Sequence, residues 1–255
     1  MNQHKSNDAV NLFWTGGWDS TFQLLHFLLV NQRPVQPYYI LDDERQSTGI
    51  EIYCRSKILQ SINHNYPKAF PLIYPTIYIN KELIENDQTI SSSWNKIYLD
   101  HHIGTQYDWL PRFCKQNCIT NMQIGLFKSD KLEAPSKFYN YHMKYFALRN
   151  ENQENFITHH LMKEYHTLFR YFEGSLLQTT KQEMYQFAHH NNWLDTLNLT
   201  NFCYRPSVKI KACGICSPCT QAIDNSMGWR IPFSGVMNRW LYKCKTTIKH
   251  DILKL

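Results

Sequence analysis

The chain has 255 residues, of which 43% are hydrophobic and 15% aromatic, so it can bury a sizeable core and is not a globally disordered chain. Its net charge of +6 is mild and its basic residues are scattered, so a phosphate-bearing ligand or RNA is compatible with the charge but not required by it. No apolar run reaches about 18 residues, and the N-terminal MNQHKSNDAV lacks the apolar stretch of a signal peptide, so we expect a cytoplasmic protein without a membrane span.

Short apolar runs alternate with amphipathic stretches from the N-terminus onward. The first run, residues 9–14, predicts a buried strand that ends at a Gly-Gly pair; the helix that follows, residues 20–31, has Asp19 or Ser20 as its predicted N-cap. Further strands are expected at 35–41, 72–79, 121–127 and 167–172, and further helices at 50–62, 104–117, within 138–173 and at 179–192. Pro75 favours an edge position for the strand at 72–79. This alternation predicts an α/β fold with a parallel sheet covered by helices on both faces.

The domain organisation follows from the absence of internal repeats and low-complexity linkers in the sequence. We expect one α/β domain over residues 1–200, with a helical, aromatic-rich insertion at about 138–170. A cysteine-rich segment follows at 201–228, and residues 229–255 form a basic, partly helical extension.

The first motif is the turn Thr15-Gly16-Gly17-Trp18-Asp19-Ser20-Thr21, between the first strand and its helix. A strand that ends in Gly-Gly and opens a helix presents several backbone N–H groups at the positive end of the helix dipole, which makes an anion site. Glycine allows phosphates to approach the backbone closely. The Walker A pattern and G-x-G-x-x-G are both absent. The alternative is a glycine turn without a ligand.

The second motif is a set of four cysteines in the pattern C-x9-C-x2-C-x2-C: Cys203, Cys213, Cys216 and Cys219. Four thiolates at this spacing suit a closed tetrahedral zinc site, which is structural because no coordination position stays open. An iron–sulfur cluster is the alternative, since four cysteines also hold such clusters.

The glycine turn resembles the Ser-Gly-Gly-x-Asp-Ser signature of the PP-loop (N-type) ATP pyrophosphatases, with Thr15 in place of the first serine. Together the two motifs resemble one branch of that superfamily, the 7-cyano-7-deazaguanine synthases of queuosine precursor synthesis, over about residues 9–228. The shorter matches are Arg45-Gln46, Gln123-Ile124-Gly125, Thr180-Lys181-Gln182-Glu183, Phe202-Cys203-Tyr204 and the run from Cys213 to Cys219.

The resemblance implies an adenine-nucleotide α-hydrolase-like sheet and an ATP- and Mg²⁺-dependent ligase. Such an enzyme adenylates a small-molecule carboxylate and joins it to ammonia or another amine, giving an amide or nitrile. It implies ATP binding by Thr15, Gly16, Gly17, Trp18, Asp19, Ser20, Thr21, Leu41, Asp42 and Gly125, catalysis by Asp19, Ser20 and Lys181, and substrate contacts from Arg45, Gln46, Lys128 and Asp130. For Lys181 the alternative is a solvated residue in the first turn of a helix.

The chain departs from the family in its substrate loop. Residues 126–138, LFKSDKLEAPSKF, keep only Asp130 from the family's run, and Ser47 stands where the family has a histidine. The resemblance therefore supports ATP binding and zinc binding by this chain more strongly than recognition of the deazaguanine base. The chain therefore resembles a diverged relative, such as those in bacterial anti-phage gene clusters, acting on another acid or on a protein amine.

A different class of function is also open. A mildly basic, aromatic-rich chain with a zinc segment could bind ATP without catalysis and serve as an interaction module for RNA or a protein partner. The family and the aromatic surplus favour a homodimer.

Overall fold

The computed structural model describes residues 9–128, 137–149, 161–207 and 209–252, and it has an α/β fold. Its sheet has five strands in the order β3-β2-β1-β4-β5, and every neighbouring pair is parallel. The expected parallel sheet is therefore confirmed. The strands are β1 (Val10–Phe13), β2 (Val35–Leu41), β3 (Ile77–Asn80), β4 (Met122–Gln123) and β5 (Phe172–Glu173).

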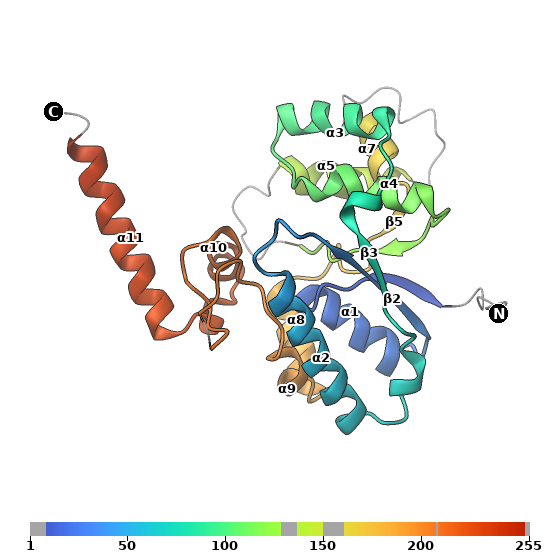
Figure 1. The fold of residues 1–255 in the computed structure, drawn as a ribbon, viewed down its shortest axis with the longest axis horizontal. Coiled ribbons are helices and arrows are strands. Elements are labelled where there is room, and N and C mark those ends of the chain that lie inside the picture. Colours follow the sequence, from blue (N-terminus) through green and yellow to red (C-terminus); the bar gives the residue numbers. More distant parts are fainter. Residues whose placement is uncertain (1–8, 129–136, 150–160, 208, 253–255) are drawn as a thin grey trace.

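Helices cover both faces of the sheet because successive side chains of a strand point to opposite sides. In β1, Val10 and Leu12 pack into one core cluster and Phe13 into the other. Figure 1 shows the two helical layers. The Leu12 side is covered by α1 (Trp18–Leu29), α2 (Thr48–Asn65), α8 (Lys181–His190) and α9 (Leu194–Leu197), and the Phe13 side by α3 (Gln88–Asp100), α4 (Gln106–Gln116), α5 (Lys137–Leu148) and α7 (Met162–Phe169).

Several elements differ from their predicted bounds. The α1 helix begins at Trp18 with Gly17 as its N-cap and without a capping side chain, so the predicted cap at Asp19 or Ser20 is wrong. The strand expected at 72–79 is the edge strand β3 and starts at Ile77, after Pro75. The strand expected at 167–172 is reduced to Phe172–Glu173, because α7 continues to Phe169.

The helix α3 was not expected from the sequence. Its buried positions, Ile90, Ser93 and Ile97, are spaced for one helical face, but the serine run hides the apolar periodicity. Its N-cap is Asp87, whose carboxylate accepts a hydrogen bond from the backbone N–H of Ile90.

The C-terminal part lies beside the sheet domain, and its last helix extends away from the body of the molecule (Figure 1). Its helices are α10 (Ser217–Asp224) and α11 (Phe233–Ile252), and short 3₁₀ turns occur at Phe70–Leu72, Lys81–Leu83 and Gly228–Arg230. The partly helical tail is confirmed. Along α11 the side chains of Phe233, Trp240 and Leu241 are exposed. Among the described residues, no helix combines the length and the apolar character that crossing a membrane requires.

Candidate functional site

A cavity of about 300 Å³ opens at the carboxyl ends of β1, β2 and β4. The chain builds the sheet outward from β1 in one direction through β2 and β3, and then in the other through β4 and β5. Such a topological switch point is where ligands bind in open parallel α/β sheets. Of the residues singled out from the sequence, the cavity is lined by Thr15, Gly17, Trp18, Asp19, Ser20, Arg45, Gly125 and Lys181.

The turn after β1 needs glycine for steric reasons. Gly16 has φ +77°, and a Cβ there would lie 2.7 Å from Cγ of Arg55. Gly17 donates its N–H to Oγ1 of Thr15 at 3.3 Å, and Ser20 Oγ lies 3.4 Å from the same oxygen. Helix geometry leaves the N–H groups of the first turn of α1 without carbonyl partners inside the helix, and they lie at the positive end of its dipole. The turn thus has the features of an anion site.

Lys181 and Asp19 form an ion pair at the edge of this turn. The capping box of Thr180 and Glu183 fixes the start of α8 and so places Lys181, which is 8% exposed. Its ammonium also lies 4.1 Å from the centroid of the Phe127 ring. Burial and the nearby Arg230 lower the pKa of Lys181. The alternative of a solvated first-turn lysine is therefore wrong, and Asp19 offsets the cost of burying this cation.

The opposite wall of the cavity is a hydrogen-bonded network around the buried carboxylate of Glu51. This carboxylate accepts hydrogen bonds from Tyr39 Oη at 3.0 Å, from Ser47 Oγ at 2.8 Å and from the Arg45 guanidinium at 2.8 Å. Burial and Glu51 raise the pKa of Tyr39, so its hydroxyl is a neutral donor. Arg45 also lies over the ring of Tyr204, 5.9 Å from its centroid. The network holds Arg45 at the mouth of the cavity.

Some residues singled out from the sequence lie away from the cavity. The carboxylate of Asp42, just after β2, accepts a hydrogen bond from Lys81 Nζ at 3.0 Å. The part of the cavity wall that β2 supplies consists of Tyr38, Tyr39 and Ile40 instead. The Thr21 hydroxyl accepts from the Trp14 indole at 3.0 Å. The cavity lining also omits Gly16, Leu41, Gln46 and Lys128. Asp130 lies outside the described residues.

Other lining residues were not predicted from the sequence. Asn201, Phe202 and Tyr204 reach the cavity from the cysteine segment, and Gln106 and Trp109 from α4. Phe202 and Tyr204 flank Cys203, so their place beside a metal ligand was the available signal.

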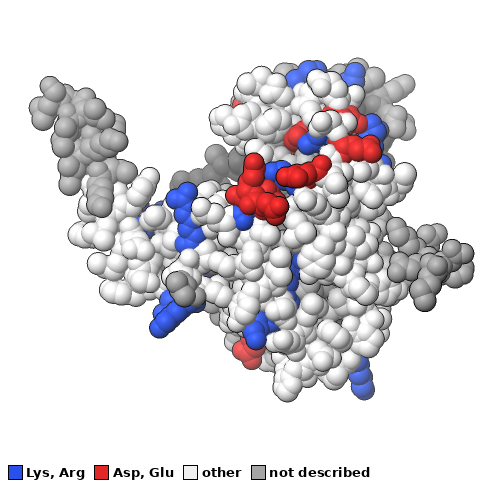
Figure 2. Space-filling view, in the orientation of Figure 1, with Lys and Arg blue, Asp and Glu red and all other residues white. Residues whose placement is uncertain are grey.

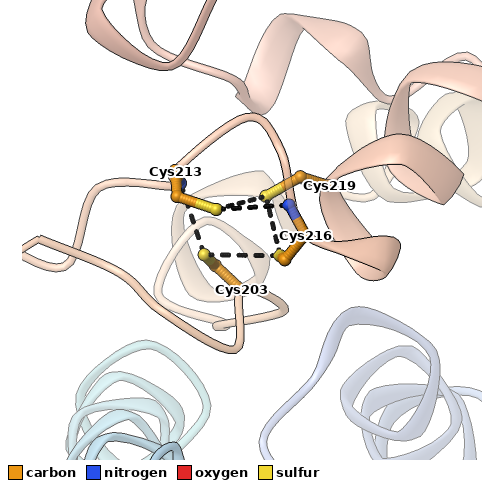
Figure 3. Close-up of side chains that lie close together, drawn as sticks. All are labelled: Cys203, Cys213, Cys216 and Cys219. Atoms are coloured by element: carbon orange, nitrogen blue, oxygen red, sulfur yellow. Dashed lines mark hydrogen bonds between the residues drawn. The ribbon is translucent and has the colours of Figure 1, made fainter. Parts of the chain in front are cut away.

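The four motif cysteines converge on one point (Figure 3). Their sulfurs all lie within 4.8 Å of one another, and two of the pairs, Cys203–Cys216 and Cys213–Cys219, are 3.8 and 3.9 Å apart. A tetrahedral zinc ion with Zn–S bonds of about 2.3 Å needs sulfurs about 3.8 Å apart. Backbone N–H groups of Cys213 and Cys216 also point at cluster sulfurs. The cluster is therefore compatible with zinc.

The cysteine cluster is also joined to both neighbouring parts of the chain. Asn201, which lines the cavity, exchanges hydrogen bonds with the backbone of Cys203. On the other side Gly214, with φ +81°, packs so tightly on Gly235 of α11 that a Cβ would lie 2.0 Å from the carbonyl oxygen of Gly235. Arg239 of α11 donates to Thr220 Oγ1 at 2.9 Å. The cysteine cluster thus connects the cavity wall with the last helix.

Comparison with protein families, curated proteins and solved structures finds no match to this chain. The function is therefore inferred from the residues and geometry of the cavity and of the cysteine cluster.

Proposed function

We propose that the protein is an ATP-dependent ligase that adenylates a carboxylate and transfers the acyl group to ammonia or another amine. The observation that supports this most is the glycine turn at the switch point of the sheet, with Asp19 and Lys181 paired at its edge. ATP phosphates would lie on the N–H groups of Trp18, Asp19 and Ser20 in the first turn of α1, with the hydroxyls of Thr15 and Ser20 as further donors. The fold would then be of the adenine-nucleotide α-hydrolase type.

A Mg²⁺ ion would accompany the phosphates. Of the two acids that line the cavity, Glu51 already accepts hydrogen bonds from three donors, which leaves Asp19 to supply a carboxylate oxygen. Mg²⁺ in nucleotide sites commonly has one or two carboxylate ligands, with phosphates and water completing the shell. Bound there, the ion would neutralise phosphate charge.

The proposed reaction has two steps. A carboxylate oxygen of the acid attacks the α-phosphorus of ATP, the bond from that phosphorus to the bridging oxygen breaks, and pyrophosphate leaves with the electron pair. Ammonia or an amine then adds to the acyl carbon, AMP leaves with its electron pair, and the nitrogen loses a proton to give the amide. A nitrile would need a second ATP to activate the amide oxygen in the same way. Lys181 would stabilise the charge that develops on the phosphates.

The metal centre would have a structural role. Zinc held by four thiolates has no open coordination position for chemistry. Its connection to Asn201 would keep Phe202 and Tyr204 at the cavity wall. On the face drawn in Figure 2, basic side chains stand apart and are mixed with acidic ones, so the described residues there form no continuous basic surface of the kind that binds nucleic acid.

The experiment is mass spectrometry after incubation of the protein with ATP, Mg²⁺, ammonium and 7-carboxy-7-deazaguanine. AMP together with the amide or nitrile is the expected result for a synthase of the queuosine type. AMP without a change in this acid would assign the enzyme another acid or amine, as in the defence-related alternative. ATP binding without AMP, across a panel of acids and amines, would contradict the ligase and support a non-catalytic module. The control is Gly17→Asp, whose carboxylate would repel the phosphates and abolish ATP binding.

A further inference from the structure

A second cavity, of about 180 Å³, adjoins the first. It lies where the starts of α1 and α8 meet α10 and the 3₁₀ turn at Gly228–Arg230. Four residues line both cavities: Trp18, Asp19, Lys181 and Phe202. The two spaces therefore meet at the Asp19–Lys181 ion pair, beside the turn that would hold the phosphates.

The second cavity contains a cation, Arg230, for which the described part of the chain provides no acidic partner. Among the described residues, Arg230 forms no ion pair; one of its nitrogens donates to the carbonyl oxygen of Thr200 at 2.7 Å. Its guanidinium lies 5.1 Å from the ring of Trp18 and 5.0 Å from the ring of Phe202, which hold it in place. Burial lowers the pKa of Arg230 to about 10, so it remains charged at neutral pH. A desolvated cation of this kind is stabilised by an anion.

Trp18 supplies an independent indication of a ligand-binding site. Its side chain is 3% exposed and lines both cavities, yet among the described residues its indole N–H has no hydrogen-bond acceptor. Buried donors almost always have an acceptor, and leaving one without costs about 1–3 kcal/mol. An acceptor on a bound ligand would remove this cost.

The other lining residues and the charges of the second cavity limit the size, polarity and charge of the ligand that fits it. Phe127, Ala222 and Met227 make much of the lining apolar, and a cavity of about 150 Å³ is enough for a benzene-sized ring. Lys181 is paired with Asp19, so the cavity offers one uncompensated positive charge, that of Arg230. A singly charged carboxylate matches it better than a doubly charged phosphate.

We propose that the second cavity binds the acid substrate: a compact flat-ring carboxylate whose carboxylate faces Arg230 and whose ring lies against Phe127 and Met227. The assignment rests on the proposed ligase, since it places the carboxylate next to the phosphate turn, where the α-phosphorus of ATP would be. It differs from the substrate contacts that the family resemblance implies, which lie at Arg45, Gln46, Lys128 and Asp130.

The test is calorimetric binding to the full chain without ATP, so that it is independent of turnover. The probes are 7-carboxy-7-deazaguanine and indole-3-carboxylate, and 7-deazaguanine and indole serve as the matching rings without a carboxylate. We expect at least one acid to bind and its ring analogue to bind about tenfold or more weakly, the loss expected for a charge-assisted hydrogen bond. Failure of both acids to bind, or equal binding of acid and ring, would overturn the assignment even if AMP formation were observed.

Three variants locate the site. Arg230→Gln should weaken binding of the acid about tenfold or more, while Arg230→Lys should restore most of it. Ala222→Phe should fill the cavity and block the acid with Arg230 intact, which covers the case in which Arg230→Gln does not fold. Ala222 does not line the first cavity, so ATP affinity in Ala222→Phe should stay within about twofold of wild type. The matched control is Lys209→Gln, an exposed cation outside both cavities. Unchanged acid binding in Arg230→Gln and in Ala222→Phe would overturn the proposal.

Discussion

The ammonium of Lys181 contacts the carboxylate of Asp19, although 162 positions separate the two residues in the chain. Gly125 makes the contact possible, because a Cβ there would lie 2.9 Å from Cβ of Asp19. Three segments, the turn after β1, the end of β4 and the start of α8, thus meet at one point. Both residues of the ion pair line both cavities.

The first prediction concerns the cation of this pair. Lys181→Met should lower the rate of AMP formation by about 100-fold or more, as loss of one charge-stabilising donor does in other enzymes. ATP affinity should fall much less, because the backbone N–H groups of the turn remain. Single-turnover kinetics and a separate ATP titration distinguish the two effects. Lys163→Met, which removes an exposed lysine of α7, is the control. Equal turnover in both variants would remove Lys181 from the chemistry.

Local patterns in the sequence were sufficient to predict the parallel sheet. The apolar runs that became β1 and β2, and the Pro75 signal for an edge strand, depend on near neighbours in the chain. The serine run of α3 weakened the same kind of signal, and the helix was missed.

Only those residues of the candidate site that belong to a sequence motif could be predicted. The glycine turn and the four cysteines have fixed spacings in the sequence. In the structure the turn lines the cavity, and the four cysteine sulfurs lie together. Arg230 belongs to no motif, and its contacts with Trp18 and Phe202 join parts of the chain that only the tertiary fold brings together. Asp42 shows the converse. It stands at the end of a strand, as a ligand-binding residue would, but its carboxylate is bonded to Lys81.

A second prediction concerns Gly16. In Gly16→Ala the new methyl group would meet the Arg55 side chain and the backbone would keep a left-handed φ, so we expect a loss of about 2 kcal/mol in the free energy of unfolding. Gly49→Ala is the matched control, since its Cβ has nothing within 4 Å and its position is helical. That variant should gain about 0.5–1 kcal/mol. Urea denaturation measures both, and equal effects would mean that the turn is not strained.

A third prediction concerns the metal. Purified protein should contain about one zinc ion per chain, and Cys216→Ser should lose most of it, because a four-thiolate site loses a ligand. Without the ion, the cysteine segment and α11 should become sensitive to proteases before the sheet domain does, since Gly214 packs on Gly235. Elemental analysis and limited proteolysis measure the two effects, and Cys118→Ser, which removes an exposed cysteine outside the cluster, is the control. Iron in place of zinc, with absorbance in the visible range, would favour the iron–sulfur cluster instead.

The last prediction concerns pH and the Asp87 cap of α3. A hydrogen bond from Lys115 and one from the backbone N–H of Ile90 hold the pKa of Asp87 below its ordinary value, although burial raises it. In the unfolded chain this carboxyl has a pKa of about 3.9, so on acidification the unfolded state takes up the proton first. The stabilisation is therefore fully present well above pH 4 and is lost as the pH falls through the lowered folded value.

Asp87→Asn keeps an oxygen acceptor for Ile90 but removes the charge that Lys115 contacts. We therefore expect wild type to be more stable than this variant at pH 6, and the difference to shrink as the pH falls below about 4. Urea denaturation at several pH values measures the difference. Asp43→Asn, at an exposed acid, should show little difference at any pH. A difference between wild type and Asp87→Asn that stays constant from pH 6 to pH 3 would show that the carboxylate is not stabilised in its charged form, because linkage requires the stability gap to follow its protonation.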